Sequence, residues 1–337
     1  MTKPPLVSVV MASYNHGAHI LEAVNSVLRQ EDVDLELLIE DDGSVDDTHN
    51  ILRKMDDKRV NVVCRSVNQG ACTTVNNLIA RAQGEFIALI NSDDVWSTYS
   101  KLREQVTILR ANPGVGAVFG RAGFIDATGS TVSAAANFYG NIFQQENRSQ
   151  GQWLRRFFFY GNCLCHPTML IRRQCYEKAG LYDNRLRQLP DLMMWIKLVK
   201  HYDILVSDQV WVDFRLIGDA NASAPTPANA MRGMNEQFLQ YEDFWDGADA
   251  QQLREGFLDL LQVWTLPTPV HLEIEKVLLY FKAGKAVGGA LRLLGLQKMH
   301  RMLASASHRA VLAKDYAITD AWLHRELGMS SPFSATQ

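Results

Sequence analysis

Two stretches of the chain place paired carboxylates shortly after an apolar run. Asp93-Asp94 comes two residues after the run 85–91, and Asp41-Asp42 comes two residues after the run 35–39. Adjacent acids at the end of a buried strand repel each other, and a hard divalent cation is the usual way to relieve that repulsion. Such ions are often shared with the phosphates of a nucleotide. Two solvated loops would explain either pair alone, but both together favour a nucleotide and metal site at the carboxyl edge of an α/β sheet.

An alternation of strands and helices up to about residue 120 would position these acids. The strands that we expect cover residues 7–12, 35–39, 60–63, 85–91 and 115–119. Apolar residues recur at helical spacing between Ile20 and Leu28 and again between Ile51 and Met55, and further helices are expected at 71–83 and 100–111. Short connections between such elements predict an open, mostly parallel sheet with helices on both faces.

The pattern weakens after residue 120. The polar stretch 133–152 predicts a loop, either over an active site or on the plain surface. Beyond it we expect strands at 168–171, 203–206 and 210–214 and helices at 173–179 and 190–200. Residues 222–227 predict a linker, and the sequence after it predicts helices only.

Composition excludes several classes of protein. A chain of 337 residues with 47% hydrophobic residues and a formal net charge of −3 gives no reason to expect nucleic acid as a partner. Its amino terminus lacks the apolar core of a signal peptide, and no run of about 18 apolar residues predicts a membrane span. Five cysteines without a repeating spacing predict a reducing, cytoplasmic environment.

The chain resembles glycosyltransferase family 2, a group of nucleotide-sugar transferases with the GT-A fold, over roughly residues 5–220. The resemblance rests on motifs in the expected order: Val9 to Asn15, Glu40 to Thr48, Asn68-Gln69-Gly70 with Asn76 and Gly84, Ser92-Asp93-Asp94, Gly161 to Ile171, Glu177 to Asp183, and Asp191 to Leu198. It implies a catalytic domain over 1–222, with a nucleotide-sugar half at 1–120 and an acceptor half at 121–222. Residues 228–337 would form a carboxy-terminal, all-helical extension.

The resemblance also implies the roles of individual residues. Asp94, with Asp93, would hold Mg²⁺ or Mn²⁺ against a diphosphate, and Asp42 would accept the N3–H of a uracil-like base. Tyr14 would offer the nucleoside its ring or its hydroxyl, or else only pack. The residues assigned to nucleotide binding are Ser13, Tyr14, Asn15, Asp41, Asp42, Asn76 and Asp93.

On the acceptor side the resemblance implies one general base. Asp191 stands at an expected helix start after Pro190, where it would take the acceptor proton, or would only stabilise the helix. One base without a second nucleophile implies a single displacement that inverts the anomeric centre. Weaker assignments, as contacts to acceptor or phosphate, go to His166, Trp195 and Arg215, and His166 could equally be a buried structural histidine.

The sequence thus predicts a soluble, metal-dependent, inverting glycosyltransferase. Its donor would be a nucleotide-sugar, UDP-linked, and its acceptor a glycan or lipid-linked oligosaccharide in cell-surface polysaccharide synthesis. Glu40 departs from the apolar residue usual in the family, so that an extra charge could alter base preference. Two alternatives stay open: a sugar-phosphate nucleotidyltransferase and a non-catalytic nucleotide-binding relative.

The span 282–314 combines cations with apolar residues and contains no acid. Basic amphipathic helices of this kind bind anionic membranes, so the span predicts peripheral contact with the inner face of a membrane. The other reading is an internal helical bundle in which these cations pair with the acidic stretch 231–280. The helical extension could also carry a homo-oligomer contact. The seven cations are Lys282, Lys285, Arg292, Lys298, Arg301, Arg309 and Lys314.

Overall fold

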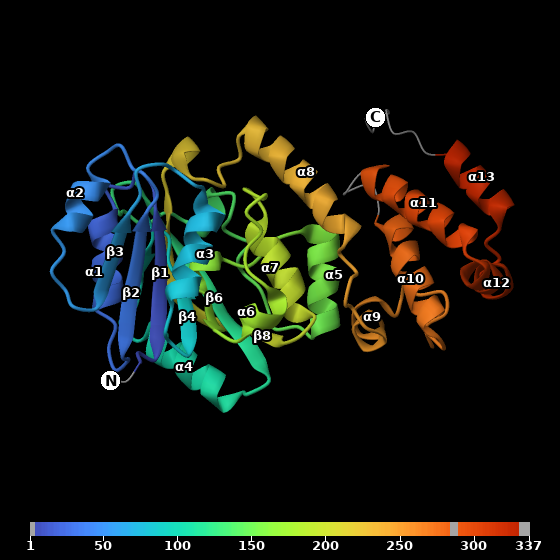
Figure 1. Ribbon diagram of the computed structural model, residues 1–337, viewed down its shortest axis with the longest axis horizontal. Coiled ribbons are helices and arrows are strands. Elements are labelled where there is room, and N and C mark those ends of the chain that lie inside the picture. The colour runs from blue at the N-terminus through green and yellow to red at the C-terminus, as the bar shows by residue number, and fades with distance from the viewer. Residues whose placement is uncertain (1–3, 284–288, 330–337) are drawn as a thin grey trace. The chain divides into compact units, whose positions relative to one another are not determined.

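A computed structural model describes residues 4–283 and 289–329, and the chain divides into two compact units. The first comprises Met1–Asn147 and Asn162–Gly233, and the second comprises Arg148–Gly161 and Met234–Gln337. The domain division at 222–228 stays a prediction. Figure 1 shows the strands in the first unit and helices alone in the second.

The first unit is built on an eight-stranded sheet of order β3-β2-β1-β4-β7-β6-β8-β5. The neighbours β3, β2, β1 and β4 run parallel, whereas β7 is antiparallel to both β4 and β6. β6 and β8 pair in parallel, and β5 pairs antiparallel with β8. The strands are β1 (Val7–Ser13), β2 (Leu35–Asp41), β3 (Val60–Cys64), β4 (Phe86–Leu89), β5 (Val95–Trp96), β6 (Val115–Asp126), β7 (Leu170–Arg172) and β8 (Asp203–Leu216).

Helices cover both faces of this sheet, as the strand–helix alternation predicts. Alternate residues of β1, namely Val7, Val9 and Met11, join one buried cluster with apolar residues of α1, α2 and α4. α3 packs against β1 and β2 without joining that cluster. The helices of this unit are α1 (Ile20–Leu28), α2 (Thr48–Arg53), α3 (Ala71–Arg81), α4 (Lys101–Ala111), α6 (Cys175–Ala179) and α7 (Pro190–Val199), with 3-10 turns at Ala134–Ala136, His166–Thr168 and Gly218–Ala220.

The second unit is helical, as expected for the carboxy-terminal extension, but it also includes an earlier helix. α5 (Gln150–Tyr160) packs against α9 (Ala250–Phe257), where Gly151 and Gly256 face each other. A second cluster joins α10 (Pro269–Lys282), α11 (Gly289–Ala304), α12 (Ala306–Asp315) and α13 (Asp320–Gly328). α8 (Pro227–Glu242) begins in the first unit and ends in the second.

Three elements differ from the sequence prediction. The predicted loop 133–152 contains the turn at Ala134–Ala136, and α5 begins before it ends. The strands expected at 203–206 and 210–214 are one strand, β8, and β5 was not expected. Among the described residues, no helix is long and apolar enough to cross a membrane.

Candidate active site

The carboxyl ends of β1 and β2 bring two unpaired side-chain oxygens together. Ser13 and Asp41 are register partners on these parallel strands, so their side chains point to the same face. Ser13 Oγ and Asp41 Oδ2 are both buried, and neither has a hydrogen-bond partner among the described residues. Buried polar atoms without hydrogen-bond partners are uncommon in native proteins, and a bound ligand is one way in which such atoms are satisfied. Both residues were assigned to nucleotide binding.

The loops that follow β1 and β2 are joined by hydrogen bonds. Asn15, in the left-handed region at φ 56°, donates its N–H to Ser44 Oγ at 2.8 Å and accepts from the Val45 N–H at 2.9 Å. Gly43 has φ 77°, and a Cβ there would lie 2.9 Å from the Asn68 nitrogen, so only glycine fits. Tyr14 is exposed at the same edge. Asn15 therefore shapes the loops through contacts within the protein.

Asp42 and Asp41 have different surroundings although they are neighbours. Both oxygens of Asp42 already accept hydrogen bonds at 2.8 Å, from the N–H groups of Gln69 and Gly70. These bonds hold the loop that leads into α3. Asp41 Oδ1 accepts from Ser44, and its Oδ2 has no such donor. The carboxylate with the unpaired oxygen is thus Asp41, whereas the role of Asp42 toward the base stays a prediction.

Glu40 is fully buried, but its charge is compensated. Arg65 donates to it from Nε at 3.0 Å and from a terminal nitrogen at 3.3 Å, and Asn77 donates at 3.1 Å. Because side chains alternate along a strand, Glu40 points to the face opposite Asp41. The extra charge expected from the sequence is therefore paired away from the face that carries Ser13 and Asp41.

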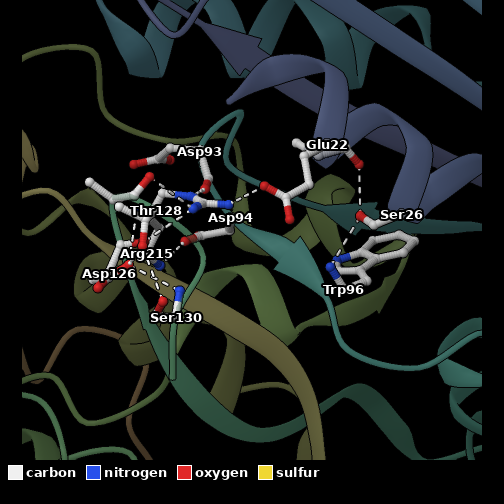
Figure 2. Close-up of polar contacts among 11 residues, drawn as sticks. Glu22, Ser26, Asp93, Asp94, Trp96, Asp126, Thr128, Ser130 and Arg215 are labelled. Atoms are coloured by element: carbon white, nitrogen blue, oxygen red, sulfur yellow. Dashed lines mark hydrogen bonds and ion pairs between the residues drawn. The ribbon is translucent and has the colours of Figure 1, made fainter. Parts of the chain in front are cut away.

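Arg215, which is itself buried, contacts both residues of the acidic pair after β4 (Figure 2). The Arg215 backbone N–H donates to Asp94 Oδ1 at 2.8 Å, and its Nε donates to the Asp93 carbonyl at 2.7 Å. The rest of the guanidinium binds Glu22 of α1 and the Asp126 carbonyl. Arg215, assigned as a contact to acceptor or phosphate, lies directly behind the acidic pair and positions it.

The residues present fit a hard divalent cation. Burial and the neighbouring Asp93 carboxylate hold the pKa of Asp94 well above its usual range, a strain that a cation would relieve. Asp94 Oδ2 accepts from Asn91 at 2.8 Å, and each carboxylate oxygen keeps a second lone pair for a ligand. One or two carboxylates suffice for Mg²⁺ when phosphates and water complete the shell.

His16 is a residue of this site that the sequence analysis missed. Its Nδ1 lies 2.7 Å from Ser92 Oγ and 3.9 Å from Asp93 Oδ1. The sequence feature that could have revealed His16 is its position in the loop after β1, the strand whose carboxyl end carries Ser13. His16 thus places an imidazole nitrogen beside the acidic pair.

Asp191 lies in the first turn of α7, as expected. Its Oδ1 accepts from the Leu192 N–H at 2.8 Å, and its Oδ2 accepts from Asn162 Nδ2 at 2.6 Å. Hydrogen bonds to the charged form and a helix amino terminus both favour an ionised carboxylate. Asn162 is the second residue that the sequence analysis missed.

The other acceptor-side residues pack together. His166 Nε2 lies 2.7 Å from the Tyr182 hydroxyl, and the Trp195 ring meets the His166 ring edge to face. Burial lowers the pKa of His166 to about 4. Trp195 is completely buried and also packs on Phe119. These contacts indicate that His166 and Trp195 pack within the protein interior.

Asn76 was assigned to the nucleotide, but its amide joins α3 to the acceptor half. Its Nδ2 donates to the Tyr182 carbonyl at 2.8 Å, and its Oδ1 accepts from the Tyr182 N–H at 3.0 Å. This pairing uses both ends of the amide. The nucleotide role of Asn76 stays a prediction.

Asp94 and Asp191 both act electrostatically on one buried residue. Burial raises the pKa of the Cys165 thiol strongly, and the charges of Asp94 and Asp191 raise it further. The expected metal ligand and the expected base are therefore both charges that the Cys165 thiol senses.

Residues 8–177 match the sequence profile of glycosyl transferase family 2, which is half of the chain. The chain belongs to that family. The putative teichuronic acid biosynthesis glycosyltransferase TuaG of Bacillus subtilis is 40% identical over 224 residues, 65% of this chain and 82% of TuaG. The glucosyltransferase WfgD of Escherichia coli, named for UDP-Glc and an α-D-GlcNAc-diphosphoundecaprenol acceptor, is 36% identical over 107 residues, 32% of this chain and 42% of its own length.

Solved structures show that this glycosyltransferase has the GT-A fold. S. aureus TarS 1-349 in complex with UDP-GlcNAc superposes with a TM-score of 0.55 at 17% identity, over 96% of this chain and 91% of TarS. The mannosyltransferase PcManGT of Pyrobaculum calidifontis, in complex with GDP-Man and Mn²⁺, gives a TM-score of 0.54 at 19% identity, over 97% and 87%. The fold class predicted from the sequence is confirmed.

Proposed function

We propose that this family 2 enzyme transfers a sugar from a UDP-sugar to a glycan or lipid-linked oligosaccharide, with inversion, in cell-surface polysaccharide synthesis. The polysaccharide role is supported by TuaG, and the donor and acceptor classes by the names of WfgD and of its E. coli counterpart WfaP. The observation that carries the chemistry is the buried acidic pair Asp93-Asp94, whose second carboxylate is fixed by the Arg215 N–H and by Asn91. It supports a cation that holds the donor diphosphate at the end of β4.

On the donor side, Asp94 and Asp93 hold Mg²⁺ or Mn²⁺ in this proposal. The cation neutralises charge that develops on the departing diphosphate. Arg215 keeps Asp94 in place through its backbone N–H. The unpaired Oδ2 of Asp41, rather than Asp42, accepts the N3–H of uracil, because both Asp42 oxygens already have donors. Ser13 Oγ is available to the same nucleoside.

On the acceptor side, Asp191 acts as the general base. It takes the hydroxyl proton as the acceptor oxygen bonds to the anomeric carbon, and the electron pair of the breaking C–O bond leaves on the diphosphate. One displacement from the opposite face inverts the anomeric centre. Asn162 and the α7 amino terminus keep Asp191 ionised and oriented until the proton arrives.

In this proposal the enzyme acts at the cytoplasmic face of the membrane, where it would bind a lipid-linked acceptor. WfgD, with its diphosphoundecaprenol-linked acceptor, supports this setting. The helical second unit would carry the peripheral contact or a homo-oligomer contact.

A screen of nucleotide sugars tests the function, because many transferases slowly give their donor to water. We expect hydrolysis of a UDP-sugar that depends on Mg²⁺ or Mn²⁺. Asp94→Ala should abolish turnover and weaken donor binding in calorimetry. Asp191→Asn should leave donor binding nearly intact and lower turnover by roughly 10²–10⁴-fold, as for a lost general base.

Asp320→Asn is a matched control, since Asp320 is the acid in the first turn of another helix, α13. Near-normal turnover of Asp191→Asn would remove Asp191 from the role of base. Release of diphosphate from a nucleoside triphosphate and a sugar phosphate would instead identify a nucleotidyltransferase.

A further inference from the structure

Three side chains of different metal-binding chemistry meet beside the nucleoside end of the sheet. Asp41 ends β2, Cys64 ends β3, and His49 lies in α2. One ligand atom of each lies within 4.8 Å of the others, and no other group of three such residues does so in the part of the chain that the structure describes. The set shares no residue with the Asp93–Asp94 pair.

The most buried member of this triad carries the unpaired atom. Asp41 is completely buried, and its Oδ2 has no hydrogen-bond partner among the described residues. This oxygen lies 3.5 Å from His49 Nδ1, within ion-pair distance but beyond the usual hydrogen-bond range. Oδ1 accepts a hydrogen bond from Ser44, so that Oδ2 is the Asp41 oxygen that faces the imidazole.

The donor types select among metals. Mg²⁺ and Mn²⁺ prefer oxygen ligands throughout, whereas a thiolate and an imidazole beside one carboxylate suit Zn²⁺. Zinc ligands lie about 2.0–2.3 Å from the ion, so neighbouring ligands approach to roughly 3.5 Å. The separations in this triad need only small side-chain rotations to reach that distance.

We propose that Asp41, His49 and Cys64 form a zinc-type metal site, with water in the fourth position. Binding deprotonates the Cys64 thiol, and the proton is released to solvent, while Asp41 offers a carboxylate oxygen and His49 an imidazole nitrogen as ligands. The site is separate from the cation that Asp93 and Asp94 would hold. Because Asp41 Oδ2 is also the oxygen assigned to the uracil N3–H, zinc and nucleoside exclude each other, a consequence that rests on the proposed function.

Co²⁺ titration of the full chain in saturating Mg²⁺ tests the site, because Co²⁺ bound to a thiolate gives a charge-transfer absorption. We expect this absorption with one equivalent of Co²⁺, and its displacement by Zn²⁺. Cys64→Ser should abolish it, and His49→Gln should weaken Co²⁺ binding at least tenfold. Cys72→Ser is the matched control, since Cys72 is also half-buried but lies outside the triad.

Absence of the absorption in the native chain, or its survival in Cys64→Ser, would overturn the proposal. Calorimetry with UDP then separates the site from the proposed function. Zn²⁺ that weakens UDP binding to the native chain but not to Cys64→Ser supports the shared oxygen. Simultaneous, independent binding of Zn²⁺ and UDP would retain the metal site and remove Asp41 from base recognition.

Discussion

Adjacent acids at the end of β2 take different roles because different donors reach them. Both carboxylate oxygens of Asp42 accept hydrogen bonds from backbone N–H groups of the loop before α3, which lie 27 and 28 residues further along the chain. Asp41, one residue earlier, points away from that loop and keeps an oxygen free. Chemical type alone therefore does not decide which carboxylate meets a ligand; the donors supplied by distant loops do.

His166 should make stability depend on pH. Burial lowers its pKa from the ordinary value of 6.5 to about 4, so between these values the unfolded chain binds a proton that the folded chain does not. Stability contributed by neutral His166 is complete above pH 6.5 and is lost as pH falls toward 4. His166→Gln, which can still bond Tyr182, should reduce this loss in thermal melts.

The melting temperature of the native chain and of His166→Gln should be measured over pH 4 to 6.5. Because other groups also titrate in this range, the difference between the two profiles isolates the contribution of His166. His324→Gln, at an exposed histidine, is the matched control for the substitution itself. A profile for His166→Gln that runs parallel to the native one would show that His166 does not titrate in this window.

At the scale of elements, the sequence located the strands and helices that carry the acids. Continuous apolar runs mark β1, β2 and β4 because both faces of these strands are covered. β8 was read as two strands because its middle, 207–209, is polar and its register with β6 shifts nearby. α5 was missed inside a polar stretch although Ser149 and Gln152 form a capping box at its start.

The contacts that the sequence did not predict have a common cause. Asn162 was not predicted, and Arg215 and Asn76 were assigned to ligands, whereas all three make contacts with residues 29 to 193 positions away. Periodicity and motifs describe neighbours in the chain, so they point to Asp94 and Asp191 but not to the contacts that hold them. The metal triad likewise joins three separate elements.

The contact between α5 and α9 should tolerate no side chain at its centre. A Cβ on Gly256 would lie 2.0 Å from the Gly151 carbonyl oxygen, which belongs to the backbone and cannot rotate away. Gly256→Ala should therefore lower the free energy of unfolding by about 1–3 kcal/mol, the range for overpacking. Urea denaturation of the full chain measures it.

Gly233→Ala, in another helix, should change the free energy of unfolding in the opposite direction. No heavy atom lies within 4 Å of a Cβ at Gly233 in α8, so alanine should stabilise by up to about 1 kcal/mol through helix propensity. Equal effects of the two substitutions would mean that the glycine contact between α5 and α9 is not tight.

At the scale of the whole molecule, the described cations of the span 282–314 divide into a group with identified protein partners and a group that is exposed. Arg292 pairs with Glu326 and Arg309 pairs with Asp320, acids that lie outside the stretch 231–280. Lys298 donates to the Glu242 carbonyl and thereby reaches that stretch. Lys282, Arg301 and Lys314 are exposed, and Lys285 lies outside the described residues. Internal pairing thus accounts for part of the basic span.

The exposed group predicts weak membrane contact. Three cations near an anionic leaflet contribute about 1 kcal/mol each, enough for a salt-sensitive association. Flotation with anionic vesicles measures this association. Replacement of Lys282, Arg301 and Lys314 by Gln should abolish the association of the protein with the vesicles. The same charge change at exposed Arg53, Lys54 and Lys58 of the first unit is the control. Association that survives the first replacement would leave internal pairing as the role of the basic span.

Arg215 sets the order in which the site can form during synthesis. Its contacts reach back 121 residues to Asp94 and 193 residues to Glu22, so both acids leave the ribosome long before the residue that they bind. Until β8 has been made, Asp94 lacks the N–H that fixes one of its carboxylate oxygens, and Glu22 lacks the guanidinium that it binds. The segment 8–177 that matches the family profile ends before residue 215, so these two contacts require chain that lies beyond it.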